Sequence, residues 1–320
     1  MLVVDNHQTR YYVLPDRLQI SNQLIHYQYL LQNSVKNETL LDSLRIASRE
    51  LATATLGDFQ KEVGNYSSLY ISADGVLSLL PFESLLLGDK YLIETAEIAN
   101  VPSLYLLPTL RERLQTDTLS LLAFADPKPE NSLQPLPFSL KEVQWISALF
   151  KGEQCKLLTG AAAAKSFLFS PEASRFNLLH FATHSSIDHD DPLRSRTWLS
   201  PDTSGDSTNY LTLDDVMRLS LSADLVVLSS CESGGGRYQL GEGIEGFVRA
   251  FMYAGCRNVV VSLWDVEDFT SATFMKTFYQ NLNHGYVSAL RQAKLEMIKS
   301  PRLRYRHPYY WAPFVLVLGQ

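Results

Sequence analysis

DLVVLSS at residues 224–230 and NLLHFAT at residues 177–183 are the two stretches that decide the fold. Each is a short run of apolar side chains with polar residues at its ends, which is typical of a strand buried on both faces of a parallel sheet. Similar runs occur at TLSLLAFA (118–125), CKLL (155–158), RNVVVSL (257–263) and PFVLVLG (313–319). Because helical patterns separate these runs, we expect an α/β fold with a mostly parallel sheet of about six strands, flanked by helices.

The helical patterns lie between the expected strands, and two of them carry end signals. Thr212 and Asp215 have the spacing of a capping box, and Gly255 is a residue type favoured just after a helix. The patterns are SLKEVQWISALF (139–150), TLDDVMRLS (212–220) and GIEGFVRAFMYAG (243–255), with two more near 269–283 and 286–299.

The first part of the chain has a different pattern. Residues 17–63 are mostly helical in periodicity, and a strand at 68–73 is followed by Asp74-Gly75, a hairpin or turn signal. We therefore expect a second, smaller α/β lobe. The predicted lobes are residues 1–115 and 116–320, with RERLQTD (111–117) as the linker.

Composition excludes several classes of protein. The 320 residues are 46% hydrophobic, enough for one large core or two modest ones, and the net charge of −6 includes no basic stripe that would bind nucleic acid directly. No long apolar run or secretion signal is present, so we expect no membrane association. Cys155, Cys231 and Cys256 include no C-x-x-C pair, which favours free thiols in a reducing cytoplasm.

His184 and Cys231 directly follow two of the predicted strands, NLLHFAT and DLVVLSS. Parallel sheets collect their functional groups beyond the carboxyl ends of the strands, and an imidazole beside a cysteine activates the thiol for acyl transfer. The plain alternative is that Cys231 is a small apolar filler and His184 a polar strand end. The glycines in SSCESGGG (229–236) favour the reactive interpretation, because they let backbone N–H groups approach a substrate closely.

Several motifs together resemble the CHAT domain, the caspase-like family in which separase is also placed. They are YISADGVLSLLPFESLLL (70–87), LLHFATH (178–184), DLVVLSSCESG (224–234), GEGIEGFVRAFMYAGCRNVVVSLWDVED (241–268) and HPYYWAPFVLVLG (307–319). The resemblance implies a caspase-like three-layer sandwich with an N-terminal pseudo-caspase lobe. The histidine lies 47 residues before the cysteine, a spacing like that of caspases, although the local caspase signature is absent.

The same resemblance implies roles for individual residues. Cys231 would be the nucleophile of a cysteine endopeptidase and His184 its general acid and base. The backbone N–H groups of Cys231 and Ser185 would form the oxyanion hole, although the family often has glycine at the position of Ser185. Asp265 and Asp268, in SLWDVED, resemble acids that lie near the basic P1 side chain of a substrate. An equally good interpretation is that the two acids cap the following helix.

Other sequence motifs are better explained as structural features than as binding or catalytic sites. GEGIEG (241–246) matches a dinucleotide-binding pattern but does not directly follow a strand, and His180 is best interpreted as a satisfied core histidine. The acids and histidine of residues 188–191 are better explained as a solvated loop than as a cation site. We expect no cofactor and no metal.

The expected partners are a polypeptide substrate and a regulatory protein or fused sensor or repeat domain, which the resemblance implies. The competing hypothesis is a catalytically silent CHAT module that acts as an interaction or signalling scaffold. A redox-sensing thiol at Cys231 is a third hypothesis, for which no resolving cysteine lies nearby in sequence.

Overall fold

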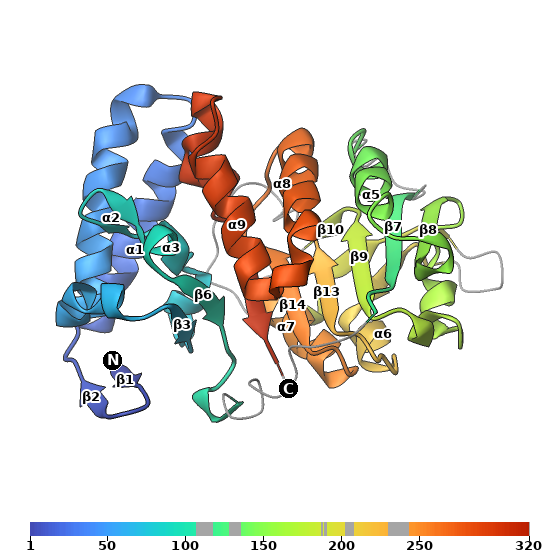
Figure 1. Cartoon of the computed structure of the whole chain (residues 1–320), viewed down its shortest axis with the longest axis horizontal. Helices are drawn as coiled ribbons and strands as arrows, with labels where there is room; N and C mark the ends of the chain where they lie inside the picture. The colour runs from blue at the N-terminus through green and yellow to red at the C-terminus, as the bar shows by residue number, and fades with distance from the viewer. Residues whose placement is uncertain are drawn as a thin grey trace. The chain divides into compact units, whose positions relative to one another are not determined.

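The computed structural model describes residues 1–106, 118–127, 136–186, 188, 191–201, 208–229 and 243–319. They form two compact units (Figure 1). Unit 1 comprises Met1–Ile98 and Lys294–Ala312, and unit 2 comprises Ala99–Ala293 and Pro313–Gln320. The predicted lobe boundary and the predicted linker 111–117 fall in a part of the chain outside the described residues.

The main sheet has the strand order β3-β6-β15-β14-β13-β9-β7-β8. Its pairings from β8 to β14 are parallel, and β15 is antiparallel to β14. The mixed α/β fold with a mostly parallel sheet is therefore confirmed. The strands are β3 (Ser68–Ile71), β6 (Glu97–Asn100), β7 (Leu121–Pro127), β8 (Cys155–Gly160), β9 (Leu178–Ala182), β13 (Leu225–Leu228), β14 (Asn258–Ser262) and β15 (Phe314–Leu318).

The expected count of about six strands was too low by two. The six predicted strands are β7, β8, β9, β13, β14 and β15, and the sheet also contains β3 and β6. β3 was predicted as a strand of the smaller lobe. β6 escaped prediction because its sequence, EIAN, has only two apolar residues between polar ones, too few to form a recognisable run.

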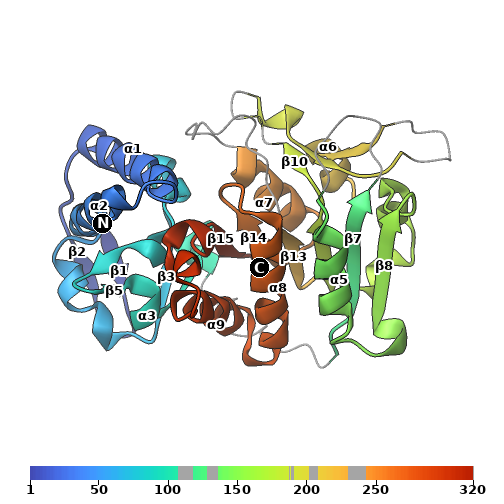
Figure 2. The same ribbon diagram turned by 90° about the horizontal axis from the view of Figure 1, so that it is seen from above.

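The central strands of unit 2 are buried along their whole length, as their continuous apolar runs predicted. Every residue of β9, β13 and β14 is buried. Figure 2 shows α5 and α8 on one face of these strands and α6 and α7 on the other, which gives three layers. The helices are α5 (Ser139–Ser147), α6 (Leu213–Met217), α7 (Gly243–Tyr253), α8 (Asp268–Gln280) and α9 (Tyr286–Ile298).

Both predicted helix-end signals are confirmed. Thr212 and Asp215 form the reciprocal capping box of α6. Gly255 follows α7 with φ +105°, and a Cβ added there would lie 2.3 Å from the carbonyl oxygen of Leu221. Only glycine fits at this turn into β14, because any other residue would be strained at this φ and its Cβ would clash with Leu221.

Unit 1 contains the helices that the sequence predicted over residues 17–63. They are α1 (Arg17–Asn33), capped by Asp16, and α2 (Leu41–Leu56). Asp74-Gly75 marks a turn and not a hairpin, because a 3-10 helix, Gly75–Leu79, follows it instead of a second strand. Glycine suits the turn, since φ of Gly75 is +59°.

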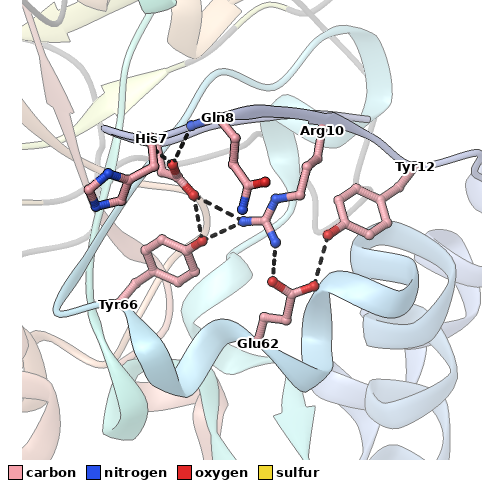
Figure 3. Close-up of polar contacts among 7 residues, drawn as sticks. His7, Gln8, Arg10, Tyr12, Glu62 and Tyr66 are labelled. Atoms are coloured by element: carbon pink, nitrogen blue, oxygen red, sulfur yellow. Dashed lines mark hydrogen bonds and ion pairs between the residues drawn. The ribbon is translucent and has the colours of Figure 1, made fainter.

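A hairpin at the start of unit 1, formed by β1 (Leu2–Val4) and β2 (Thr9–Tyr11), is fixed by a polar cluster around Arg10. Figure 3 shows the Arg10 guanidinium between the Glu62 carboxylate and the Tyr66 hydroxyl. Tyr66 also donates to Asp5 at 2.9 Å. Backbone N–H groups of the hairpin loop, together with Tyr66, lower the pKa of Asp5 to about 2. The cluster thereby connects the hairpin to the segment after α2.

A buried ion pair lies in the interior of unit 1. The Lys294 ammonium, on α9, is 2.9 Å from a Glu83 carboxylate oxygen, and both side chains are at most 1% exposed. Burial lowers the pKa of Lys294, while Glu83 opposes that shift. Ser84, the neighbour of Glu83, hydrogen-bonds the Tyr27 hydroxyl at 2.7 Å.

We predict that Lys294→Met lowers the free energy of unfolding by about 3–5 kcal/mol, because it leaves the Glu83 carboxylate buried without its counter-ion. The double variant Glu83→Gln/Lys294→Met should lose clearly less. The measurement is denaturant unfolding, with Lys299→Met, at an exposed position, as the control within about 0.5 kcal/mol of wild type. A loss below about 1 kcal/mol for Lys294→Met would contradict the prediction.

Candidate active site

The carboxyl ends of β9 and β13 lie side by side. The two strands are parallel neighbours in which Leu228 pairs with Phe181, and the Ser229 N–H donates to the Phe181 carbonyl at 3.1 Å. His184 follows β9 and is partly exposed. The chain that leaves β13 therefore starts beside the chain that carries His184, at the edge where parallel α/β sheets place their functional groups. Cys231 itself lies outside the described residues.

A small antiparallel sheet holds the backbone of His184 and Ser185. Its order is β10-β11-β12, and the strands are β10 (Ser185–Ser186), β11 (Arg196–Trp198) and β12 (Tyr210–Thr212). The Trp198 N–H donates to the His184 carbonyl at 2.8 Å. Described residues on both sides of the 187–190 loop thus pair with each other next to the candidate histidine.

The register of this sheet determines where the Ser185 N–H points. Ser185 lies opposite Thr197, and the hydrogen bond from Trp198 to His184 flanks that pair. The pair is therefore of the non-hydrogen-bonded kind, in which the N–H groups point away from the partner strand. Consistently, the two side-chain hydroxyls meet at 3.1 Å. Because β10 is an edge strand, the Ser185 N–H is directed outward from the small sheet.

The two candidate acids have different surroundings. Asp265 is exposed in the segment between β14 and α8. Asp268 is the first residue of α8 and partly buried, and its carboxylate accepts the Phe138 N–H at 2.5 Å. Burial raises the pKa of Asp268, and the Glu142 charge adds to this, whereas the Phe138 N–H and His184 act in the opposite direction. The structure thus brings Asp268 into a defined contact with the residue just before α5.

His180 is a satisfied core histidine, as predicted. It is fully buried, with Nε2 2.7 Å from Glu142 and Nδ1 3.1 Å from the Tyr279 hydroxyl. Burial raises the pKa of Tyr279 well above its usual value. Glu142 escaped prediction, because it stands in a helical pattern where a glutamate is normally solvent-exposed.

The two cysteines that the structure describes, Cys155 and Cys256, are poor nucleophiles. Burial raises the pKa of Cys155 to about 11 and that of Cys256 to about 12. Their thiols stay protonated at neutral pH, and the thiolate is the reactive form.

The loop after β10 is held by its own polar groups. The Asp188 N–H donates to Ser195 at 3.0 Å, and the Asp188 carboxylate accepts the Asp191 N–H at 2.9 Å. His189 and Asp190 lie outside the described residues. Within the described part of the chain, no group of three or more His, Cys, Asp or Glu side chains is placed to hold a metal ion. No helix in that part is long and apolar enough to span a membrane.

Comparisons with solved structures agree with this architecture. The separase–securin complex of Saccharomyces cerevisiae matches with a TM-score of 0.50 at 17% identity, covering 78% of this chain and 15% of that one. Gingipain R, named as an Arg-specific cysteine proteinase, matches with a TM-score of 0.50 at 11% identity, covering 84% of this chain and 68% of that one. At these identities the likeness shows the fold alone, and it confirms the caspase-like α/β expectation.

Comparisons of sequence give the family. Human tetratricopeptide repeat protein 28 is 28% identical over 304 residues, and its mouse counterpart is 27% identical over 308 residues. These alignments cover 80% of this chain and only 12% of the relatives' length. The model of the CHAT domain matches residues 45–319, which is most of the chain. The chain therefore belongs to the CHAT domain family.

Proposed function

We propose that this chain is a cysteine endopeptidase in which Cys231 is the nucleophile and His184 the proton-transfer partner. The observation that carries the proposal is the parallel pairing of β9 with β13, since the two residues follow these neighbouring strands. Membership of the CHAT family supports it, as does the fold shared with separase and with an Arg-specific cysteine proteinase. Cys155 and Cys256, with their raised pKa values, offer no competing nucleophile.

The proposed reaction has two steps. The Cys231 thiol gives its proton to His184, and the thiolate attacks the carbonyl carbon of the scissile peptide bond. His184 then gives that proton to the leaving amine, so the C–N bond breaks and an acyl-enzyme remains. In the second step water loses a proton to His184 and attacks the acyl carbon, which releases the carboxylic acid and the thiol.

The oxyanion of each tetrahedral intermediate would be stabilised by backbone N–H groups of Cys231 and Ser185. The outward direction of the Ser185 N–H supports this role, because the donor is not used in the ladder with β11. The Ser185 side chain is buried and turned toward Thr197, so it does not stand in the way of the N–H. A serine here in place of glycine is therefore compatible with an oxyanion donor.

For substrate specificity, we favour Asp265 over Asp268 as the acid that binds a basic P1 side chain. Asp265 is exposed, whereas Asp268 is partly buried and already accepts a backbone hydrogen bond. A carboxylate that a substrate can reach pairs with Arg through two hydrogen bonds or with Lys as a point charge.

Regulation is proposed to come from a partner or a fused repeat domain. The curated relatives are tetratricopeptide repeat proteins of which this chain corresponds to a small part. A reducing cytoplasm is the proposed setting, because the mechanism requires Cys231 as a free thiol.

The first prediction concerns the dyad. Cys231 of wild type should react with iodoacetamide or an acyloxymethyl-ketone probe at neutral pH at least about 10 times faster than in His184→Ala, which lacks the base. Cys155 and Cys256 serve as internal controls and should label slowly in both proteins. Equal labelling of Cys231 in both, with no cleavage in a peptide library, would favour the non-catalytic scaffold instead.

The second prediction isolates the backbone donor. Ser185→Pro removes the N–H and should lower kcat by about 100–1,000-fold, the usual cost of losing one oxyanion donor. Ser185→Ala keeps the N–H and should retain most of the activity. Circular dichroism and thermal unfolding would establish that both variants are folded. Equal losses in the two folded variants would argue against a backbone role.

The third prediction concerns specificity. Asp265→Asn should reduce kcat/KM for substrates with Arg or Lys at P1 by about 10–100-fold, because it removes the charge that pairs with the base. A peptide-library cleavage profile of both proteins gives the measurement, with Glu267→Gln as the control at a nearby exposed acid. An unchanged P1 profile in Asp265→Asn would exclude this acid from the pocket.

A further inference from the structure

Asp268 is held in a position that neither the proposed nucleophile nor the proposed P1 pocket requires. It begins α8, and its carboxylate accepts the N–H of Phe138, the residue just before α5. The rings of Phe138 and Phe269 reinforce this junction edge to face, with centroids 5.1 Å apart. Contacts from two elements therefore fix the carboxylate in place.

The contacts of α5 place this junction near the level of His184. Glu142, one helical turn after Phe138, reaches His180 in the middle of β9 at 2.7 Å. α5 lies in the crossover between the parallel strands β7 and β8 and so runs back against them. One turn toward its start covers about 5–6 Å, or roughly two residues of strand. Phe138, and with it Asp268, thus lies at about the level of Ala182, two residues before His184.

The electrostatics of Asp268 agree with this placement. Two other charged groups act on the carboxylate: Glu142 from α5, which disfavours its ionisation, and His184 beyond β9, which favours it. An ionised carboxylate at this position attracts a positive charge on the His184 ring. Partial burial keeps solvent from screening the interaction completely.

We infer that Asp268 is a positioning residue that stabilises the imidazolium of His184 from the start of α8. The inference rests on the proposed function, because the imidazolium forms whenever His184 holds the proton of Cys231 or of water. Asp268 takes up no proton and touches no substrate in this role. Glu142 opposes the charge of Asp268 but is itself paired with His180, which leaves Asp268 to act on His184.

The test measures the titration of His184 directly. Proteins with ¹³Cε1-labelled histidine are followed by NMR from pH 4 to 9, and the His184 signal is assigned by its loss in His184→Gln. Asp268→Asn keeps an oxygen that accepts the Phe138 N–H but removes the charge. We expect the His184 midpoint to fall by about 0.5–1 pH unit in this variant. Asp268→Glu, which restores the charge, should recover most of the difference.

Glu267→Gln is the matched control, since it removes the neighbouring charge at an exposed position. Its midpoint should move by less than about 0.2 pH unit. An unchanged His184 midpoint in Asp268→Asn, or equal shifts in both variants, would overturn the inference. If Asp268→Asn fails to fold, Asp268→Ser provides the same neutralisation with a hydroxyl that can still accept from Phe138.

This readout is independent of cleavage, so the two hypotheses fail separately. A shifted midpoint in a protein that cleaves no peptide would reject the protease and keep the electrostatic role of Asp268. An unchanged midpoint together with lost cleavage in Asp268→Asn would keep the protease and reject the role inferred for Asp268. In an active enzyme, the acidic limb of kcat/KM should follow the His184 midpoint in each variant.

Discussion

The parallel pairing of β9 with β13 is the constraint on which the rest of this structure depends. Each strand presents apolar side chains on both faces, so the sheet is stable only with helices on both sides. α5 and α8 cover one face and α6 and α7 the other, so the carboxyl ends of the two strands lie together at one edge of the sheet (Figure 2). The chain segments that follow the two strands therefore start side by side, so the apolar core determines where both segments begin.

The layer between the sheet and the helices α5 and α8 contains polar groups that satisfy one another. Glu142, His180 and Tyr279 come from three different elements and are all buried, which links α5, β9 and α8 by hydrogen bonds as well as by packing. Such a network has few alternative arrangements, because any displacement leaves a buried polar atom unpaired. The elements that carry His184 and Asp268 are thereby held in a single geometry.

The sequence predicted the parts of the fold that depend on continuous patterns, and it missed those that depend on distant partners. Six strands were identified from continuous apolar runs, which in β9, β13 and β14 reflect burial on both faces, while β6 has too short an apolar run. The same apolar runs allowed the sequence to predict that His184 and Cys231 each follow a strand. The packing of α5 against α8 determines the burial of Glu142 and the different surroundings of Asp265 and Asp268. That packing cannot be predicted from a local sequence pattern.

The buried pair of Lys294 and Glu83 also bears on how this domain can be divided. The boundary between the two compact units passes through the interior of α9, between Ala293 and Lys294. Unit 1 therefore needs a segment from near the end of the chain to neutralise a carboxylate contributed from its first hundred residues. Neither unit is a contiguous stretch that a gene fusion or a truncation could move intact. Separating the two units would therefore require a cut inside α9.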